Sequence, residues 1–466
     1  MKLKTLRIFA AVLILPTSCA TFSPAADATK PNVLLTMADD LTFNSLGCYG
    51  SKDGITPNID RLAGEGMLFR RAFTATAMCA PTRQQLYTGI FPVRNGAYPN
   101  HSKVKPGTKS IVHYLRDLGY RVGICGKKHF GPPDSFPFET ISQAKIAEFI
   151  GRDKDQPFCL IYTSHSPHLP WSAGDPSRYD PDKLTVPPYL YDNEETRKAL
   201  CKYFAEVTDF DREVGECMKL VKDAGVEDNT IFICTTEQGA QFPHGKWTCY
   251  DIGLHVGLII RWPDRVKAGS ESNAMVQYVD IVPTLIAAAG GKPVEGLDGR
   301  SFLPVLLGKT DKHADVVYGV HTTRGIIAGT PEGYPIRSIR TGTHKYIMNL
   351  NHEAPFHNVL IRGDSGGYWR SWVEAAKTDP KAAKLVKWYQ HRPAEELYDI
   401  VKDPYELNNL AGDPANRELM DGLRKKLEAW MDQQGDKGLE TELKRAPKDQ
   451  KKPKKPGRKK RSEEKE

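Results

Sequence analysis

A cysteine and an arginine stand four residues apart, at Cys79 and Arg83, in the segment CAPTR. Pro81 is tolerated in a first helical turn, where its missing N–H has no partner to lose, and Gly89 is typical of a helix end. The pattern therefore predicts a helix over residues 79–88 with Cys79 at its positive N-terminus. The unpaired amides of that turn, the helix dipole and the Arg83 guanidinium together favour a bound anion beside a sulfur nucleophile.

This segment has two further interpretations. A lone cysteine is most often a buried, inert residue, here one that precedes an ordinary surface helix. A phosphatase loop that uses a thiolate nucleophile needs five residues between Cys and Arg, whereas Cys79 and Arg83 are separated by three. The phosphatase interpretation is therefore weak, and the choice between an inert and a reactive cysteine depends on the rest of the chain.

Four short apolar runs each stop abruptly in a polar cluster. Residues 32–37 lead to Asp39 and Asp40, residues 121–125 to Lys127 and His129, residues 158–163 to His168, and residues 230–235 to Glu237 and Gln238. Strands that are apolar throughout, with helices between them, are typical of a mostly parallel sheet covered on both faces. Ligands of such sheets bind beyond the carboxyl ends of the strands, so we expect the polar clusters to converge there.

Adjacent acids such as Asp39 and Asp40 are often no more than a turn or a helix cap. Joined to Glu237 and Gln238 from another strand end, they supply the hard oxygen ligands that calcium or magnesium takes. A divalent metal site is therefore one of two interpretations of this pair.

The remaining sequence indicates an α/β protein with a smaller second domain. A stripe of apolar residues at helical spacing between residues 200 and 214 predicts a core helix, and another between residues 419 and 430 predicts a last amphipathic helix. After about residue 330 the pattern changes to shorter extended pieces. We expect four segments: a signal peptide at 1–28, a catalytic α/β domain at 29–330, a smaller α+β domain at 331–442, and a basic disordered tail at 443–466.

The first residues predict export. Basic residues precede an apolar run over residues 8–15, and a small-residue stretch at 25–28 offers a cleavage site, so this leader is too short to stay as a membrane span. Cys19 raises a less favoured alternative, anchoring as a lipoprotein. The expected location is periplasmic or secreted.

The formal charge of +8 does not indicate a nucleic-acid partner. Residues 444–466 contain 12 basic and 4 acidic residues, so this tail alone accounts for a net +8. Such a run is usually solvated, and adhesion of the tail to polyanions is a minority interpretation. The nine cysteines have irregular spacings that form neither a disulfide framework nor a zinc site, and Cys125, Cys159 and Cys234 are expected to be buried, reduced thiols.

The pattern Cys-x-Pro-x-Arg at residues 79–83, followed by Leu-x-Thr-Gly at residues 86–89, resembles the signature of the sulfatase family. The resemblance implies an alkaline-phosphatase-like fold. It also implies that Cys79 is oxidised to formylglycine, the aldehyde that performs catalysis, by a formylglycine-generating enzyme. Thr82 departs from the usual Ser or Ala of the family.

The same resemblance implies one calcium ion, with formylglycine at position 79 completing a ligand set of Asp39, Asp40, Glu237 and Gln238. The family usually has Asp followed by Asn or His where this chain has Glu and Gln. Both replacements keep the ligating oxygens and lengthen each side chain by one methylene. The resemblance therefore implies calcium, and the Glu237-Gln238 pair leaves the identity of the metal open.

Lys127 and His129 resemble the family's Gly-Lys-x-His element, His168 its second histidine, and Lys246 a basic position that follows the second metal-binding pair. The implied reaction begins with attack on sulfur by a hydroxyl of the hydrated aldehyde, while the metal, Arg83, Lys127 and Lys246 hold the charge on the sulfuryl oxygens. His168, assisted by Lys246, is the candidate acid for the leaving group. His129 helps to remove the proton from the remaining hydroxyl, so that the aldehyde returns.

Within the family, the chain resembles the sulfamidases, which cut the N-sulfate of glucosamine, in the segments at residues 126–132, 334–340 and 349–351. Residues 396–399 look like the ending common to many sulfatases. Glu237, Gln238 and Lys246 differ from the animal sulfamidase pattern, so an O-sulfated sugar stays open as substrate. His321 is expected to meet the sugar from the domain junction, with a packed histidine as an equal alternative.

These observations predict an exported sulfatase that acts on a sulfated saccharide, most of all on N-sulfoglucosamine. Three different functions stay open: an O-sulfatase, a phosphonate or phosphodiester hydrolase on the same scaffold, and a relative that binds sulfated glycans without cutting them. No nucleic-acid partner and no stable membrane span are expected, and the oligomeric state is left open.

Overall fold

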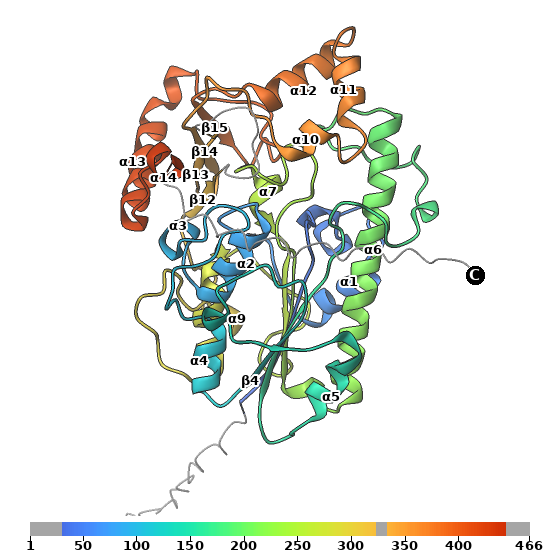
Figure 1. The fold of residues 1–466 in the computed structure, drawn as a ribbon, viewed down its shortest axis with the longest axis vertical. Helices are drawn as coiled ribbons and strands as arrows, with labels where there is room; N and C mark the ends of the chain where they lie inside the picture. Colours follow the sequence, from blue (N-terminus) through green and yellow to red (C-terminus); the bar gives the residue numbers. More distant parts are fainter. Residues whose placement is uncertain (1–29, 323–332, 444–466) are drawn as a thin grey trace, which may run out of the picture.

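The protein is described here by a computed structural model of residues 30–322 and 333–443 (Figure 1). The predicted signal peptide, Cys19 and nearly all of the predicted basic tail lie outside the described residues.

The main sheet has eight strands in the order β10-β2-β9-β7-β1-β6-β4-β5. Their bounds are β1 Asn32–Met37, β2 Met67–Phe69, β4 Arg121–Gly126, β5 Glu139–Thr140, β6 Phe158–Thr163, β7 Thr230–Thr235, β9 Leu258–Arg261 and β10 Ser270–Ser272. The four predicted strands are neighbours: β1 lies between β7 and β6, and β4 pairs with β6, all of them parallel. Only β9 runs antiparallel to its neighbours, so the predicted mostly parallel sheet is confirmed.

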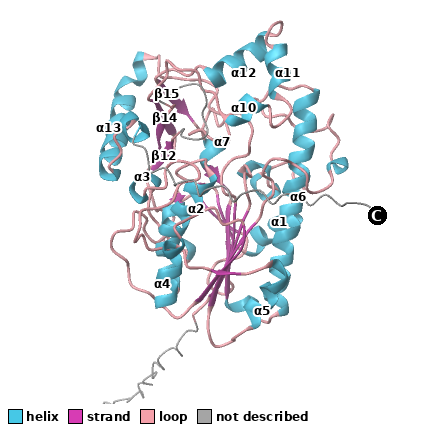
Figure 2. Cartoon of the chain, viewed as in Figure 1, coloured by secondary structure: helices cyan, strands magenta, loops and turns pink. Residues whose placement is uncertain are grey.

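Helices cover both faces of this sheet, as Figures 1 and 2 show with α1, α5 and α6 on one side and α2 and α4 on the other. Alternate residues of β1 face different cores because side chains of a strand alternate. Leu34 belongs to the core that α6 covers, whereas Val33 and Leu35 belong to the core that also holds Leu86 of α2. The strand is therefore buried at every position.

The described helices are α1 Pro57–Glu65, α2 Cys79–Thr88, α3 Pro92–Asn95, α4 Ile111–Asp117, α5 Ile146–Gly151, α6 Glu194–Asp223, α7 Asp251–Leu254, α8 Ile281–Ala288, α9 Leu303–Leu306, α10 Val359–Gly363, α11 Trp369–Ala375, α12 Pro380–Gln390, α13 Arg417–Gln434 and α14 Leu439–Leu443. The long α6 contains the predicted core stripe, and α13 is the predicted last amphipathic helix. Asn193 caps α6 by accepting the Thr196 N–H at 3.0 Å, which satisfies one of the free amides of the first turn.

A second, antiparallel sheet has four strands: β12 Val317–His321, β13 Ile336–Arg340, β14 His344–Asn349 and β15 Glu395–Asp399. It lies above the main sheet in Figure 1, with α13 packed on it. The expected domain boundary at residue 330 separates β12 from β13, although these two strands pair over five residues. Long-range pairing of this kind leaves no local signal in a sequence.

A buried group of charges joins the second sheet to the large domain. Asp251 on α7 accepts from Arg340 Nε at 2.8 Å and from Lys345 Nζ at 2.7 Å, and Glu406 lies 3.6 Å from the same lysine. Glu406 also accepts the backbone N–H of Asp251 at 2.6 Å. We call Asp251, Arg340, Lys345 and Glu406 the junction cluster.

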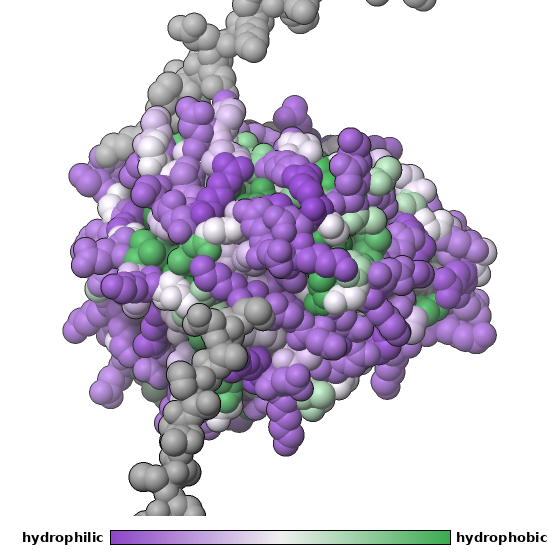
Figure 3. All heavy atoms as spheres, turned by 90° about the horizontal axis from the view of Figure 1, so that it is seen from below, coloured by the Kyte–Doolittle hydropathy of each residue, from purple (hydrophilic) through white to green (hydrophobic). Residues whose placement is uncertain are grey.

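A short third sheet pairs β3 Ala72–Phe73 with β8 His255–Val256 and β11 Val276–Gln277. All eight cysteines in the described part of the chain are free, and Cys125, Cys159 and Cys234 are buried as predicted. Within residues 30–322 and 333–443, no helix combines the length and the apolarity that crossing a bilayer requires. The face drawn in Figure 3 is mostly hydrophilic, with apolar side chains in small separate patches.

Candidate active site

Cys79 is the first residue of α2, and Gly89 ends the helix in the left-handed conformation with φ 68°, as the sequence predicts. Every residue of α2 is buried, so this is not a surface helix. The helix contacts α3, α4 and α8, which hold its first turn at the carboxyl edge of the main sheet. Its free amides and dipole therefore point at the same place as the strand ends.

Backbone hydrogen bonds draw the loops after the strands together. After β1, the N–H of Ala38 donates to Thr235 O of β7 at 3.1 Å, and the N–H of Asp39 donates to Ser166 O, beyond β6, at 3.0 Å. After β4, the N–H of Lys127 donates to Thr163 O of β6 at 3.2 Å. The polar clusters that follow β1, β4, β6 and β7 therefore converge.

The converging carboxylates are paired with cations from other elements. Arg83 Nε lies 2.5 Å from Glu237 Oε1, and Lys246 Nζ lies 2.6 Å from Asp40 Oδ2. Lys127 Nζ donates to Asp39 Oδ2. All but Lys127 have fully buried side chains, with at most 2% exposed. We call these residues together with Cys79, Gln238, His129 and His168 the catalytic cluster.

Position 79 stabilises negative charge. Burial raises the pKa of the Cys79 thiol, but Lys246 and Lys127 reverse that effect and bring its pKa well below the usual value. Burial likewise opposes the charge of Lys246, whose pKa is nevertheless raised by Asp40. An anion at position 79 thus faces lysines that stay protonated at neutral pH.

The cluster also offers a group of oxygen and sulfur donors around one point. Gln238 Nε2 lies 2.7 Å from Asp40 Oδ1, 3.2 Å from Glu237 Oε2 and 3.3 Å from Cys79 Sγ, while its own Oε1 is buried without a hydrogen bond. The amide nitrogen is thus surrounded by acceptors, and an amide flip places Oε1 in its position as a further oxygen donor for a cation that these groups share. These predicted ligands fit a hard divalent ion.

His168 is the remaining donor near that point. One ligand atom from each of His168, Asp39, Asp40 and Cys79 lies within 4.8 Å of the others. The His168 Nδ1 contacts Leu169 O at 2.5 Å, which leaves Nε2 facing Asp40 Oδ2 at 3.6 Å. Burial lowers the pKa of His168, but Asp40, Cys79 and Asp39 together outweigh it, so the net pKa is raised. A protonated His168 with a directed Nε2–H suits the donation of a proton.

Three more histidines, His129, His101 and His321, differ in their surroundings. His129 belongs to the cluster and shares a hydrogen bond with His101, a residue that no sequence pattern marked. His321 is fully buried, and its ring packs 6.0 Å from that of Phe356. This contact corresponds to the packed alternative, and a role of His321 in binding sugar stays a prediction.

Backbone strain is concentrated at this site. Asp40, His101, His129 and Trp247 have φ between 50° and 66°, in the left-handed region that costs a residue other than glycine about 1 kcal/mol or more.

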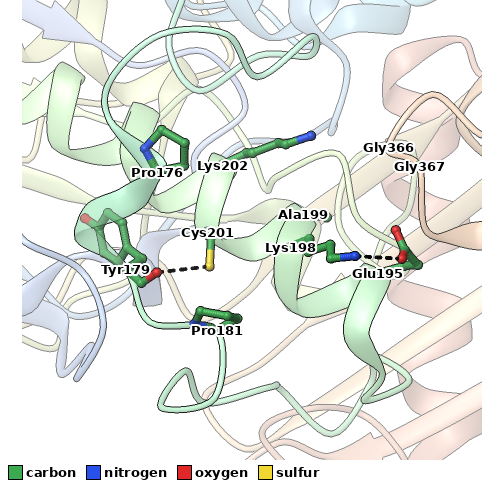
Figure 4. Close-up of a pocket in the computed structure, with 10 residues that line it drawn as sticks. All are labelled: Pro176, Tyr179, Pro181, Glu195, Lys198, Ala199, Cys201, Lys202, Gly366 and Gly367. Atoms are coloured by element: carbon green, nitrogen blue, oxygen red, sulfur yellow. Dashed lines mark hydrogen bonds and ion pairs between the residues drawn. The ribbon is translucent and has the colours of Figure 1, made fainter.

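A separate pocket on α6, lined by Tyr179, Cys201 and Gly366 among others, includes no predicted site residue (Figure 4). This pocket is therefore not part of the candidate site.

The fold and the cluster define a class of protein: an alkaline-phosphatase-like α/β fold in which a cysteine, buried acids and cations meet at the carboxyl edge of the main sheet. The family profile named Sulfatase matches residues 31–141 and 136–291. A second profile, described as N-sulphoglucosamine sulphohydrolase, C-terminal, matches residues 242–354 and 375–433. The chain belongs to the sulfatase family and is a sulfuric ester hydrolase.

Individual relatives are similar over most of the chain. An ulvan-active sulfatase of Formosa agariphila is 35% identical over 431 residues, 88% of this chain and 82% of that protein. N-sulphoglucosamine sulphohydrolase of Homo sapiens is 29% identical over 470 residues, 86% of this chain and 90% of that protein. A protein solved in complex with its substrate D-glucosamine-2-N,6-O-disulfate has a TM-score of 0.67 at 22% identity, covering 88% of this chain and 99% of that one, which is a likeness of fold.

Proposed function

We propose that this enzyme removes sulfate from a sulfated glycan, with the N-sulfate of glucosamine as preferred target, and that it uses formylglycine made from Cys79 together with one calcium ion. The single observation that supports the chemistry is the meeting of Cys79 with three carboxyls, an amide and three cations at one sheet edge. The proposal includes maturation by a formylglycine-generating enzyme, and export directed by residues 1–28.

The chain's own residues supply most of the catalysis in this proposal. The formylglycine and the metal supply a hydroxyl nucleophile and a Lewis acid when present. Arg83, Lys127 and Lys246 neutralise the charge on the sulfuryl oxygens from fixed positions, and Arg83 and Lys246 are fully buried, where electrostatic stabilisation is strongest. His168 Nε2 donates a proton to the leaving group, because Leu169 O holds Nδ1 and Asp40 favours the charged ring.

The preference for an N-sulfate is supported by the match of the C-terminal half to the sulphoglucosamine sulphohydrolase profile, and by the similarity to the human enzyme of that name. The second candidate is an O-sulfate of a sugar. It is favoured by the higher identity to the ulvan-active sulfatase, 35% against 29%, and by the Glu237-Gln238 pair.

A substrate screen separates the two candidates. Protein from a host that makes formylglycine is incubated with N-, 6-O- and 3-O-sulfated glucosamine and with a 2-O-sulfated sugar, and released sulfate is measured by ion chromatography. The conversion of Cys79 is quantified in the same sample by peptide mass spectrometry. Turnover of the N-sulfate supports the proposal, while turnover of O-sulfates alone rejects the N-sulfate and keeps the family chemistry.

Two further arms of the screen test for a phosphate-directed hydrolase and for a glycan-binding protein without activity. Phosphate and phosphonate esters assayed side by side with the sulfates detect a phosphonate or phosphodiester hydrolase. Glycan binding by protein with unmodified Cys79 and no turnover identifies a binding relative. The Cys79→Ala variant is the control in every arm.

A further inference from the structure

His101 lies beside the catalytic cluster on a loop that no sequence motif marks. The loop connects α3 and α4, and His101 is exposed at its surface. Its Nδ1 lies 2.8 Å from Nε2 of His129, and the two ring centroids are 4.7 Å apart. Both histidines have φ in the left-handed region, 61° and 50°, so their backbones are held in a costly conformation.

The two loops that contain these histidines are held to α2 by one buried side chain. Gln84 donates from Nε2 to Ser102 O at 2.9 Å and accepts at Oε1 from the N–H of Val104 at 3.1 Å and of Gly131 at 3.3 Å. The N–H of Val104 also donates to Gly131 O at 2.9 Å, and this bond joins the loops directly. The loop of His101 and the loop of His129 are therefore both held in place where the two histidines meet.

A series of hydrogen bonds sets the tautomers of the pair. The backbone N–H of Ala80, in the first turn of α2, donates to Asn100 Oδ1 at 3.4 Å. A backbone N–H only donates, so the amide NH2 of Asn100 faces Nε2 of His101, at 3.3 Å. The nitrogen Nε2 of His101 is then an acceptor, and the ring hydrogen of neutral His101 is on Nδ1.

The same logic extends to His129. Since Nδ1–H of His101 donates to Nε2 of His129, the hydrogen of a neutral His129 is on its buried Nδ1. Nδ1 is then the nitrogen left for residue 79: it is buried and has no hydrogen-bond partner among the described residues, and His129 is one of the groups that face Cys79.

We propose that His101 is a positioning residue for sulfate hydrolysis: it holds the imidazole of His129 with an Nδ1–H directed at residue 79, in a tautomer set by Asn100 and the Ala80 N–H. The proposal rests on the proposed function for its kinetic test. In this tautomer His129 is a donor to the oxygen of residue 79. The proton-removing role implied by family resemblance requires the other tautomer of both rings: His129 Nδ1 loses its hydrogen, His101 passes its Nδ1 hydrogen to His129 Nε2, and His101 Nε2 takes up a proton from solvent.

The kinetic test compares His101→Ala with His101→Asn, because the Asn amide nitrogen reaches nearly the position of Nδ1 and keeps a donor there. His391, exposed in the C-terminal domain, supplies the matched controls His391→Ala and His391→Asn. We expect His101→Ala to lower kcat about 10- to 100-fold, as removal of an outer partner of an active-site histidine typically does, with little change of KM. His101→Asn should recover most of that loss.

Equal kcat in His101→Ala and His391→Ala overturns the proposal, and so does an Asn variant as poor as the Ala variant. Formylglycine content is measured in each preparation, so that a defect in maturation is not counted as a defect in kcat. Turnover is followed with glucosamine N-sulfate and with 4-nitrophenyl sulfate.

A second measurement does not depend on turnover. In protein labelled with ¹⁵N-histidine, two-bond ¹H–¹⁵N spectra distinguish the two tautomers of a neutral ring, and the signals lost in His129→Asn identify His129. We expect Nδ1–H in the wild type and a changed pattern in His101→Ala. An Nε2–H tautomer in the wild type overturns the proposal even if sulfate is released. Absence of sulfate release with the expected tautomer rejects the proposed function instead.

Discussion

The catalytic cluster and the junction cluster are two buried groups of acids and cations in one chain, and they differ in what their charges contact. In the junction cluster, Asp251 accepts from Arg340 and Lys345 at 2.8 and 2.7 Å, and these cations come from strands of the second sheet. In the catalytic cluster, Lys246 and Lys127 also face a buried thiol, and they lower the pKa of Cys79 below its usual value.

Access to solvent also separates the two clusters. The junction side chains are at most 10% exposed, whereas the side chain of Lys127 is 16% exposed and that of His168 is 34% exposed. Buried charge by itself therefore does not identify a site. A buried thiol beside partly exposed basic side chains distinguishes the catalytic cluster from the junction cluster.

The largest expected effect is on turnover in Cys79→Ala. Removing the residue that becomes the nucleophile should lower sulfate release by at least about 10⁴-fold, in line with the loss of a nucleophile in other covalent mechanisms. The substitution removes one sulfur atom and leaves the ion pairs in place, so the folded protein should remain. Released sulfate and a urea unfolding curve measure the two effects, and residual turnover above a hundredth of wild type would contradict the role of Cys79.

The converse result is expected in the junction cluster. Asp251→Ala leaves Arg340 and Lys345 buried without their shared partner, so the free energy of unfolding should fall by about 3–5 kcal/mol. The activity of the fraction that stays folded should change little. Asp421→Ala, in a half-exposed pair 3.5 Å from Arg417, is the control and should cost less than about 1 kcal/mol. A similar fall in the free energy of unfolding in both variants would show that the junction cluster stabilises the protein no more than an exposed ion pair does.

Acid should destabilise the protein through buried neutral histidines outside the catalytic cluster. Burial lowers the pKa of His255 to about 3, below the value of about 6.5 in an unfolded chain, so the unfolded state binds more protons below pH 6.5. The stabilisation is complete above pH 6.5 and is lost as the pH falls toward 3. Between pH 6.5 and 5 the loss should be about 1.5–2 kcal/mol for this residue.

Unfolding curves at several pH values measure this slope. His255 stacks on Phe43 with centroids 3.7 Å apart, so His255→Phe keeps an aromatic ring and removes the titration. The variant should have a smaller loss of stability between pH 6.5 and 5 than the wild type. An unchanged slope would assign the acid sensitivity to other groups.

The smallest expected effect is on metal binding, and it tests whether Gln238 is a ligand. Gln238→Ala should weaken calcium binding to formylglycine-containing protein by at least about tenfold, because it removes an oxygen donor from the predicted ligand set. Isothermal titration calorimetry measures the affinity directly. Gln434→Ala, another buried glutamine, on α13, is the control, and equal affinities in the two variants would remove Gln238 from the site.

Local patterns predicted much of this molecule. The four apolar runs are β1, β4, β6 and β7, and the helix predicted over residues 79–88 is α2. The convergence of the clusters followed from one rule about parallel sheets, and the contacts confirm it. The roles of the individual residues remain predictions.

Local sequence patterns did not predict which side chains pair inside the site. Nothing in the spacing assigns Lys246 to Asp40, which is 206 residues away, or Lys127 to Asp39. His101 is a lone histidine in a polar loop, and only the contact with His129 distinguishes it. For His321 the sequence left sugar contact and packing as equal alternatives, and its ring lies 6.0 Å from that of Phe356.

The sequence by itself determined the strands, the nucleophile helix and the identity of the charged residues, because hydrophobic periodicity and helix-end chemistry act over a few residues. Only the tertiary structure decided which cation meets which carboxylate, which buried acids face a thiol, and which histidine holds another. Those contacts depend on the order of strands in the sheet and on loops that close over it, and both are set by packing between segments far apart in the chain.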